Sequence, residues 1–172
     1  MIYYDDYRYM GGIDIVAKDD KKYFAKVGPD LLEAALTKEI SLQQWLSIFK
    51  PKRKQKTYRA ICTALLDQST VSGIGNYLKS EILYQASISP DRSVDTISDE
   101  EWDKVRIAAH AIILKSYEHG GLTIESFISP DGKLGVYPAM VYGKETDPEG
   151  RVVEKITTRD QRGTYWVPEV QV

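Results

Sequence analysis

The segment Gly73-Ile74-Gly75-Asn76 lies between two stretches of helical apolar spacing and contains the residue types of an anion-binding turn. Glycine permits positive φ angles and a close approach of the backbone to a neighbour. The turn opens a helix, whose first N–H groups lack an intrahelical acceptor and lie at the positive end of the helix dipole. Asn76 adds a side-chain amide, so the segment could hold one anion without a charged side chain. The alternative is a tight helix–helix turn in which the glycines only avoid a clash, and the short motif does not decide between the two.

Basic residues follow one another without any acidic residue from Lys50 to Arg59, although the 172-residue chain has a formal net charge of -2. This run is either a solvated linker or a phosphate-facing patch. Cys62 is the single cysteine, which excludes an internal disulfide and a cysteine-rich metal site, and it is interpreted as a small buried residue. We predict no metal and no cofactor. No apolar run of about 18 residues suggests a membrane span, and an intracellular location is expected.

The elements that must position these groups are short strands followed by helices. Strands are expected at 12–17 and 22–27, on either side of the polar turn KDDKK. Two capping patterns, DLLE and SLQQ, start helices further along the chain. The two helices follow the N-caps Asp30 and Ser41, and two further helices are expected at 58–66 and at 75–86.

The second half of the chain is predicted to contain one long helix and then a β-rich end. A capping box at Ser98–Glu101 starts the helix, and the residues at 119–121 end it with a left-handed glycine cap. From Ile124 on, Gly, Pro and Asp recur between β-prone pieces at 151–156 and 164–167, which predicts loops followed by a terminal β-hairpin. One face of the helix should be buried because of the spacing of Trp102, Val105, Ala109, Ile112 and Ser116.

The segment LLDQSTVSGIGNYLKSEILYQASISPDR, residues 65–92, closely resembles the helix–two-turn–helix segment of the formamidopyrimidine-DNA glycosylase / endonuclease VIII family of base-excision-repair enzymes. Four further segments are similar to family motifs in the same order: DDYRYMGG, VGPDLL, GGLTIESFISPDGKLG and VYGKETDPEGRVVEKITTRDQRGTYWVPEVQ. The resemblance implies a mainly α fold, a helix-two-turn-helix bundle with a short N-terminal β-hairpin and a C-terminal β-hairpin. The implied divisions are a remnant of the N-terminal β domain at 1–28, the helix-two-turn-helix domain at 29–122, and a lesion-loop region with the finger hairpin at 123–172.

The same resemblance assigns residues to DNA phosphates. Asn76 would contact a phosphate beside the damaged nucleotide, with backbone help from Gly73 and Gly75. Arg162, in the segment QRGTYW, would contact phosphates flanking the flipped-out nucleotide, a task that suits a guanidinium fork.

Three further residues are assigned to DNA through the resemblance. Lys133 would contact a phosphate or the lesion, Arg8 would reach the orphaned partner base, and Met10 would act as an apolar wedge in the base stack. Lys79 and Glu81, by contrast, are expected to serve the surface of their helix.

Two departures from the family pattern bear on metal and on catalysis. Most members bind zinc through finger cysteines, but this sequence has Val167 and Val170 in the last pair, so the hairpin resembles the zincless finger of some members. Tyr165, Trp166 and Val167 would then hold the hairpin by apolar packing. The family's chemistry uses an N-terminal Pro-Glu, whereas this chain begins Met1-Ile2, so no catalytic residue is assigned and the chain alone is expected to be non-catalytic.

Together these features predict the DNA-binding C-terminal region of a base-excision-repair DNA glycosylase and AP lyase. Its expected partner is duplex DNA containing a damaged base or an abasic site, bound by a monomer, and the family's N-terminal domain would be a further partner. Two alternatives stay open. One is a non-catalytic helix-two-turn-helix module that binds RNA or protein, and the other is a degenerate homologue without nucleic-acid affinity, which the negative net charge favours.

Overall fold

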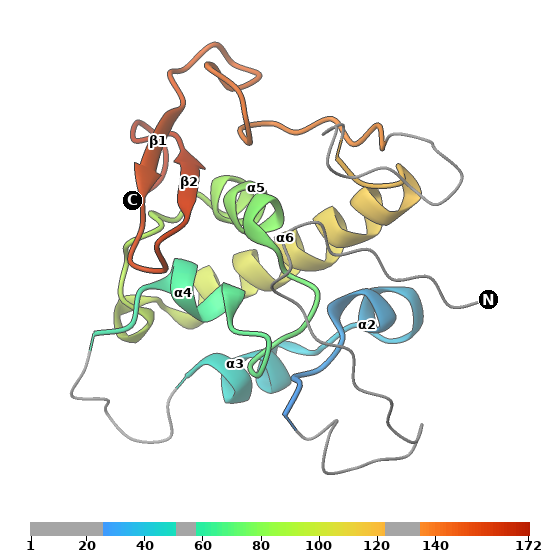
Figure 1. Cartoon of the computed structure of the whole chain (residues 1–172). Coiled ribbons are helices and arrows are strands. Elements are labelled where there is room, and N and C mark those ends of the chain that lie inside the picture. The colour runs from blue at the N-terminus through green and yellow to red at the C-terminus, as the bar shows by residue number, and fades with distance from the viewer. Residues whose placement is uncertain (1–25, 51–57, 123–134) are drawn as a thin grey trace, which may run out of the picture.

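The computed structural model describes residues 26–50, 58–122 and 135–172. This part of the chain is mainly helical, with one two-stranded antiparallel sheet near its end (Figure 1). The helices are α2 (Leu31–Thr37), α3 (Leu42–Phe49), α4 (Ile61–Leu66), α5 (Asn76–Ala86) and α6 (Asp99–Glu118), with a short 3-10 helix η1 (Val94–Thr96), and the strands are β1 (Glu154–Thr157) and β2 (Gly163–Trp166). The predicted mainly α fold with a C-terminal hairpin is confirmed. The predicted N-terminal strands lie outside the described residues, except for Lys26 and Val27, which are in a turn.

Helix α6 is the element on which three other helices pack: α5, α2 and α3 contact it, and α4 contacts α5 (Figure 1). Its predicted buried face is confirmed, since Trp102, Val105 and Ala109 are inaccessible to solvent. The predicted capping box of Ser98 and Glu101 is complete at its start. At its end Gly120 has φ +67, and the N–H of Gly121 donates to the carbonyl of Ser116 at 2.8 Å, which is a glycine-terminated helix end.

Aromatic side chains form the centre of the helical core. The rings of Trp45 and Phe49 on α3 lie 4.7 Å apart, and Phe49 stacks on Trp102 of α6 at 4.9 Å. Such pairs stabilise a fold by about 0.5–1.5 kcal/mol each beyond the burial of their area. The aromatic contacts therefore fix α3 against α6. Among the described residues, no helix is both long and apolar enough to cross a bilayer.

The C-terminal hairpin lies against α5 and pairs in a regular antiparallel register, from Glu154 opposite Trp166 to Thr157 opposite Gly163. Strand β1 begins three residues later than the sequence predicts. The reason is that the preceding residues pair elsewhere: Val152 forms an isolated antiparallel bridge with Thr146, and the N–H of Val153 donates to the carbonyl of Glu145 at 2.9 Å. The turn end of the hairpin lies beside α4 (Figure 1), and the carbonyl of Gly163 accepts a hydrogen bond from the side chain of Asn76, the first residue of α5.

Candidate nucleic-acid interface

Asp67 organises the first half of the loop between α4 and α5. Its carboxylate accepts hydrogen bonds from the backbone N–H (3.0 Å) and hydroxyl (2.5 Å) of Ser69 and from the guanidinium of Arg59 (2.9 Å). The Ser69 hydroxyl makes the largest contribution to lowering the pKa of Asp67 below its usual value, against the opposing effect of burial. A charged Asp67 thus holds Arg59 beside the loop.

Gln68 holds the second half of the same loop. Its Nε2 donates to the carbonyls of Ile74 (2.9 Å) and Leu66 (3.1 Å), and its Oε1 accepts from the backbone N–H of Gly73 (3.1 Å). The side chain therefore fixes residues Gly73 and Ile74 relative to the end of α4. Asp67 and Gln68 were not singled out from the sequence; the signal available was a pair of polar residues directly after a helix, which is typical of loop-forming hydrogen bonds.

The two glycines of the bend have different roles. Gly73 has φ +100, and a Cβ there would come within 3.2 Å of Ile113, so it needs the freedom of glycine. Its N–H is engaged by Gln68, so its contribution to the bend is conformational. Gly75 has φ -97, which any residue adopts, and a Cβ there would meet no atom within 4 Å. Gly75 is thus the residue at which the backbone is open to an approaching molecule.

The N-terminus of α5 is a set of free donors. No side chain caps its first turn, and the backbone N–H groups of Gly75 and Asn76 have no acceptor among the described residues. The side chain of Asn76 donates through Nδ2 to the carbonyl of Gly163 at 2.9 Å, which connects this helix end to the hairpin. These amides and the helix dipole together favour an anion at this position.

Arg162 lies in the turn between β1 and β2, and this turn is held by its own backbone. The carbonyl of Arg162 accepts from the N–H of Thr158 (3.1 Å), and its N–H donates to the carboxylate of Asp160 (2.9 Å). Gln161 takes a left-handed conformation with φ +60 to close the turn. The guanidinium of Arg162 is exposed and has no hydrogen-bond or ion-pair partner within residues 26–50, 58–122 and 135–172.

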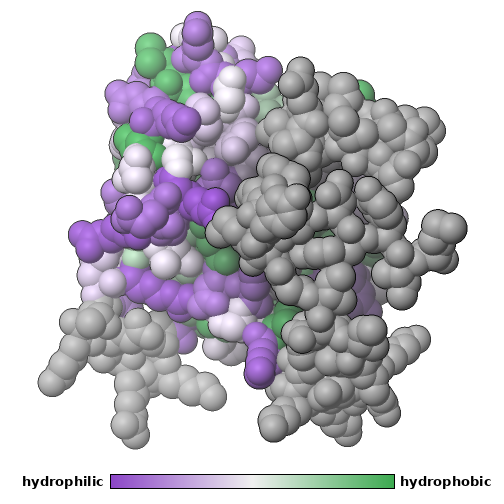
Figure 2. Space-filling model, viewed as in Figure 1, coloured by the Kyte–Doolittle hydropathy of each residue, from purple (hydrophilic) through white to green (hydrophobic). Residues whose placement is uncertain are grey.

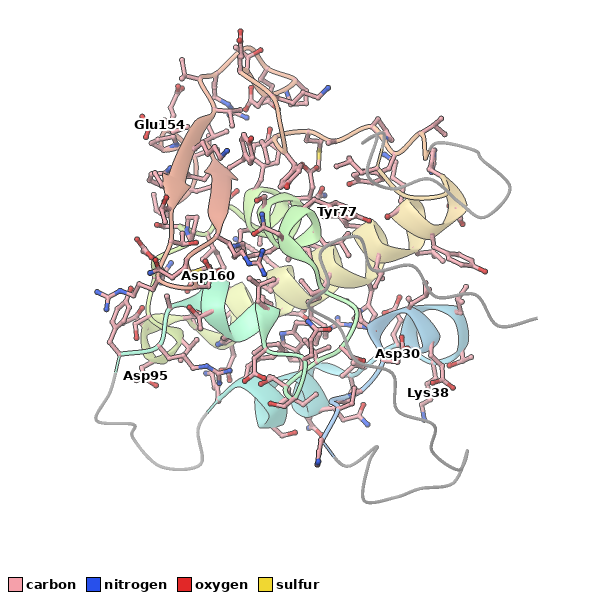
Figure 3. The ribbon with its side chains drawn as sticks, in the orientation of Figure 1. Asp30, Lys38, Tyr77, Asp95, Glu154 and Asp160 are labelled. Carbon is pink, nitrogen blue, oxygen red and sulfur yellow. The ribbon has the colours of Figure 1, made fainter. Side chains whose placement is uncertain are left out.

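These groups surround one open pocket of about 700 Å³. Gly75 and Asn76 line it from α5, Arg162 and Asp160 from the hairpin turn, and Arg59 from the segment before α4. Figure 3 shows Asp160 at the turn end of the hairpin, beside α4. Figure 2 shows hydrophilic residues across the coloured part of this face, with some apolar residues between them. The sequence-predicted residues Gly75, Asn76 and Arg162 are thus brought together, whereas Gly73 lines a separate pocket between α2, α5 and α6.

The charges around the pocket leave a local positive excess. Arg59 is paired with Asp67, and Asp160 is paired with the ammonium group of Lys79 at 2.8 Å. The guanidinium of Arg162 and the N-terminus of α5 are then the groups whose positive charge is not balanced by a neighbour in the described structure. An anion of phosphate size that enters the pocket would meet backbone amides on one side and a guanidinium on the other.

A family model for the formamidopyrimidine-DNA glycosylase H2TH domain matches residues 42–128, which are 87 of the 172 residues. The chain belongs to this H2TH family. The curated formamidopyrimidine-DNA glycosylase of Listeria innocua is 35% identical over 174 residues, covering 96% of this chain and 60% of its own length. The formamidopyrimidine-DNA glycosylase of Bacillus cereus is 30% identical over 178 residues, which cover 99% of this chain and 61% of that protein. The chain thus spans about 60% of the length of these relatives.

Solved structures of Fpg proteins have the same fold as this chain. The structure of MutM (Fpg) from Thermus thermophilus matches with a TM-score of 0.74 and 27% identity, over 90% of this chain and 57% of that one. A complex between the Lactococcus lactis Fpg and an abasic site containing DNA matches with a TM-score of 0.72 and 24% identity, over 87% of this chain and 54% of the Fpg chain.

The expectation that Lys79 and Glu81 serve the surface of the H2TH helix α5 is wrong, because both residues are completely buried. Lys79 pairs with Asp160 of the hairpin turn. The carboxylate of Glu81 accepts hydrogen bonds from the backbone N–H groups of Met140 (2.8 Å), Val141 (3.0 Å) and Tyr142 (2.8 Å). Burial, and next the proximity of the Glu81 carboxylate, raise the pKa of Tyr137 above its usual value. Polar residues within a helical pattern were interpreted as solvent-exposed, but here they hold the C-terminal segment.

The remaining sequence-predicted residues fall into two groups. Arg8, Met10 and Lys133 lie outside the described residues. Cys62 is buried in the core as predicted, and burial raises the pKa of its thiol. The environment of the thiol therefore disfavours the reactive thiolate.

The hairpin of this H2TH-family chain does not fit a zinc ion. Val167 is packed with Val141 and Val153 in a small apolar cluster, to which Tyr165 and Val170 add their side chains. The backbone N–H of Val167 donates to Oε1 of Gln171 at 2.7 Å. Within the described ranges, no three His, Cys, Asp or Glu side chains lie close enough to hold a metal. The predicted packing partner Trp166 is outside this cluster, and its indole N–H is buried without a described acceptor.

Proposed function

We propose that this chain is the DNA-binding region of a formamidopyrimidine-DNA glycosylase-type repair protein and that it contacts the sugar-phosphate backbone of duplex DNA at a damaged base or an abasic site. The observation that carries the proposal is the position of Arg162 across one pocket from the free amides of Gly75 and Asn76. Donors of this kind bind phosphate oxygens without reading base sequence. Binding by a monomer inside the cell, and partnership with an N-terminal domain of the family type, belong to the same proposal.

Several observations on relatives support the choice of DNA. Curated proteins that match almost the whole chain at 30–35% identity are formamidopyrimidine-DNA glycosylases. The Lactococcus lactis Fpg, whose fold the chain shares, is found in complexes with DNA that contains an abasic site or Fapy-dG. We further propose that the hairpin is a zincless finger, with Arg162 as its phosphate-binding residue, and that 29–122 and 123–172 are its helical and finger divisions.

The direct test is a fluorescence-anisotropy titration of the chain with a labelled duplex that carries a central tetrahydrofuran abasic-site analogue. Arg162→Gln should weaken binding by about tenfold through loss of a charge-assisted phosphate contact. Asn76→Ala should also weaken binding, because it removes the hydrogen bond that connects the N-terminus of α5 to the hairpin. Binding should fall steeply with salt, with a slope of about 0.9 per phosphate neutralised. Lys104→Gln, on the exposed part of α6, is the charge-matched control and should leave the affinity unchanged.

The same assay separates the alternatives. Competition with a structured RNA that displaces the chain as well as the abasic duplex does would favour an RNA-binding module. An unchanged DNA affinity of the Asn76→Ala/Arg162→Gln double variant would contradict the proposal and favour a homologue without nucleic-acid affinity. Borohydride treatment of the complex should give no strong covalent adduct; a strong adduct would identify this chain as a lyase with an amine nucleophile.

A further inference from the structure

Asp160 bonds to two parts of the molecule at once. Its Oδ2 accepts from the Nζ of Lys79 on α5 at 2.8 Å, and its Oδ1 accepts from the backbone N–H of Arg162 at 2.9 Å and from the hydroxyl of Thr158 at 2.6 Å. The side chain of Lys79 is 0% exposed and that of Asp160 is 7% exposed. A buried ion pair thus connects α5 to the peptide group of the residue that carries the phosphate-binding guanidinium.

The pair belongs to a row of α5 contacts that all reach the hairpin. Asn76 and Lys79, three residues apart on one face of the helix, contact Gly163 and Asp160. The adjacent Ser80 accepts through its hydroxyl from the N–H of Tyr165 at 3.3 Å. The hairpin is therefore held against the same helix whose N-terminus supplies the free amides of the pocket.

Stability alone is a poor explanation for this pair. The desolvation of two charges often cancels their attraction, and replacing such a pair by apolar residues is frequently neutral for folding. A salt bridge does, however, fix geometry, because the carboxylate must meet its donors at defined positions. Burial by itself would raise the pKa of Asp160, but the bonds from Lys79, Thr158 and the Arg162 backbone hold it below its usual value, so the group stays ionised.

We propose that Lys79 and Asp160 are positioning residues for Arg162: they set the distance between the hairpin turn and the N-terminus of α5 so that the guanidinium and the helix amides contact the same DNA strand. The inference rests on the proposed function. A positioning role differs from a merely structural role in one respect: removal of the ion pair changes DNA affinity only when Arg162 is present.

The test is a double-mutant cycle of DNA affinity. Lys79→Met/Asp160→Asn removes the ion pair without changing the net charge, and it is measured with Arg162 present and in the Arg162→Gln background. With Arg162 present, the double variant should weaken binding to abasic-analogue duplex by about tenfold and lower the salt slope by about 0.9, as Arg162→Gln does. In the Arg162→Gln background it should change the affinity by less than about twofold.

Two controls keep the outcomes separate. Arg106→Met/Asp103→Asn removes a partly buried pair on α6, at 2.8 Å, that does not contact the hairpin, and it should leave the salt slope unchanged. Asp160→Glu keeps a charge for Lys79 but displaces the turn by one methylene group, so it should weaken binding only when Arg162 is present. This variant replaces Lys79→Met/Asp160→Asn in the cycle if the neutral pair does not fold. Circular dichroism at the assay temperature verifies folding of each variant.

The results are distinguishable. Equal losses with and without Arg162, or an unchanged salt slope, would overturn the positioning role and leave the proposed function intact. If Arg162→Gln itself has no effect on DNA affinity, both the proposed function and the positioning role are overturned.

Discussion

Gly75 occupies the N-cap position of α5 with dihedral angles that serine also adopts, and the space around it is open. A serine hydroxyl at an N-cap accepts a hydrogen bond from the first-turn N–H groups. At this helix end those groups belong to Tyr77 and Leu78, directly after the N–H groups of Gly75 and Asn76 that we assign to a DNA phosphate, so the serine side chain would stand where the phosphate enters. A cap and a phosphate therefore compete for one site, which places stability and binding in opposition at this residue.

Gly75→Ser is thus expected to raise the free energy of unfolding by about 0.5 kcal/mol and to weaken DNA binding by about tenfold. Urea denaturation and anisotropy titration measure the two effects. Gly73→Ala is the matched comparison: its positive φ and the contact with Ile113 predict a loss of about 1–3 kcal/mol of stability instead. A serine variant that is more stable and binds DNA normally would show that the α5 amides do not contact phosphate.

His110 is a second residue whose protonation has a defined consequence. Its Nε2 accepts from the backbone N–H of Ile40 at 3.2 Å while Nδ1 faces the carbonyl of Arg106 at 3.0 Å, so the buried ring is neutral. Burial makes the largest contribution to lowering the pKa of His110, against the opposing effect of Glu39. Because the unfolded chain binds the proton more tightly, stability is complete above the ordinary pKa of about 6.5 and is lost as the pH falls below it.

The free energy of unfolding should therefore decrease between pH 7.5 and pH 5 by up to about 1.4 kcal/mol per pH unit. Urea denaturation across this range measures the slope. His110→Gln, which keeps an acceptor for Ile40 but does not titrate, should flatten it. The carboxylates with lowered pKa values, such as Asp67 and Asp160, lose their contribution only at lower pH. An unchanged slope in the variant would assign the pH dependence to another group.

At the scale of elements, α5 connects the two halves of the proposed interface. Its N-terminus supplies donors, and its buried polar side chains hold the segment from Met140 to Tyr165. Glu81 has the largest share in this, since one carboxylate accepts three successive backbone N–H groups. An amide in its place would set an NH₂ group against one of those donors.

Glu81→Gln is accordingly expected to lower the free energy of unfolding by about 2–4 kcal/mol, because it leaves a buried N–H unpaired. Chemical denaturation followed by tyrosine and tryptophan fluorescence measures the loss. Glu154→Gln, at an exposed position of β1, should be within about 0.5 kcal/mol of the unchanged protein. Equal stabilities of the two variants would mean that Glu81 does not hold the C-terminal segment.

The helices show which features of the fold can be predicted from the sequence and which cannot. The capping boxes at Ser41 and Ser98 and the glycine end of α6 follow from local hydrogen bonding, so their positions are predictable from a few neighbouring residues. The partners of Lys79 and Glu81 lie about 60 to 80 positions away in the chain. Helical periodicity identifies neither these partners nor the burial of the two charges. The pocket residues Asp67 and Gln68 were likewise missed because their roles arise from the loop geometry.

At the scale of the whole molecule, the net charge of -2 conceals an uneven distribution. The acidic residues around the pocket, Asp67 and Asp160, are each paired with a cation, whereas Arg162 and the α5 N-terminus are unpaired within the described structure. Local charge of this kind, and not the total, decides contact with phosphates. The negative net charge is therefore compatible with the proposed DNA binding.

The hairpin is also held by contacts that need no metal, and this predicts how the whole molecule responds to chelation. Val167 packs with Val141 and Val153, and Gln171 joins the backbone of Val167 (2.7 Å) to the carbonyl of Ile88 (2.9 Å). In a zinc-bound finger the folding free energy depends on the metal, so chelation unfolds it. Here, treatment with EDTA and 1,10-phenanthroline should change neither the melting temperature nor the affinity for abasic-analogue duplex.

Mass spectrometry of the purified chain should accordingly find zinc well below one atom per molecule. Val167→Ala is the complementary variant: it should lower stability by about 1–2 kcal/mol through the cavity it leaves, and it should weaken DNA binding because the hairpin carries Arg162. Loss of DNA binding on chelation, restored by added zinc, would show that a metal and not the valine cluster holds the hairpin. If the hairpin stays folded without metal, the apolar cluster of Val141, Val153 and Val167 takes the structural place of the zinc ion.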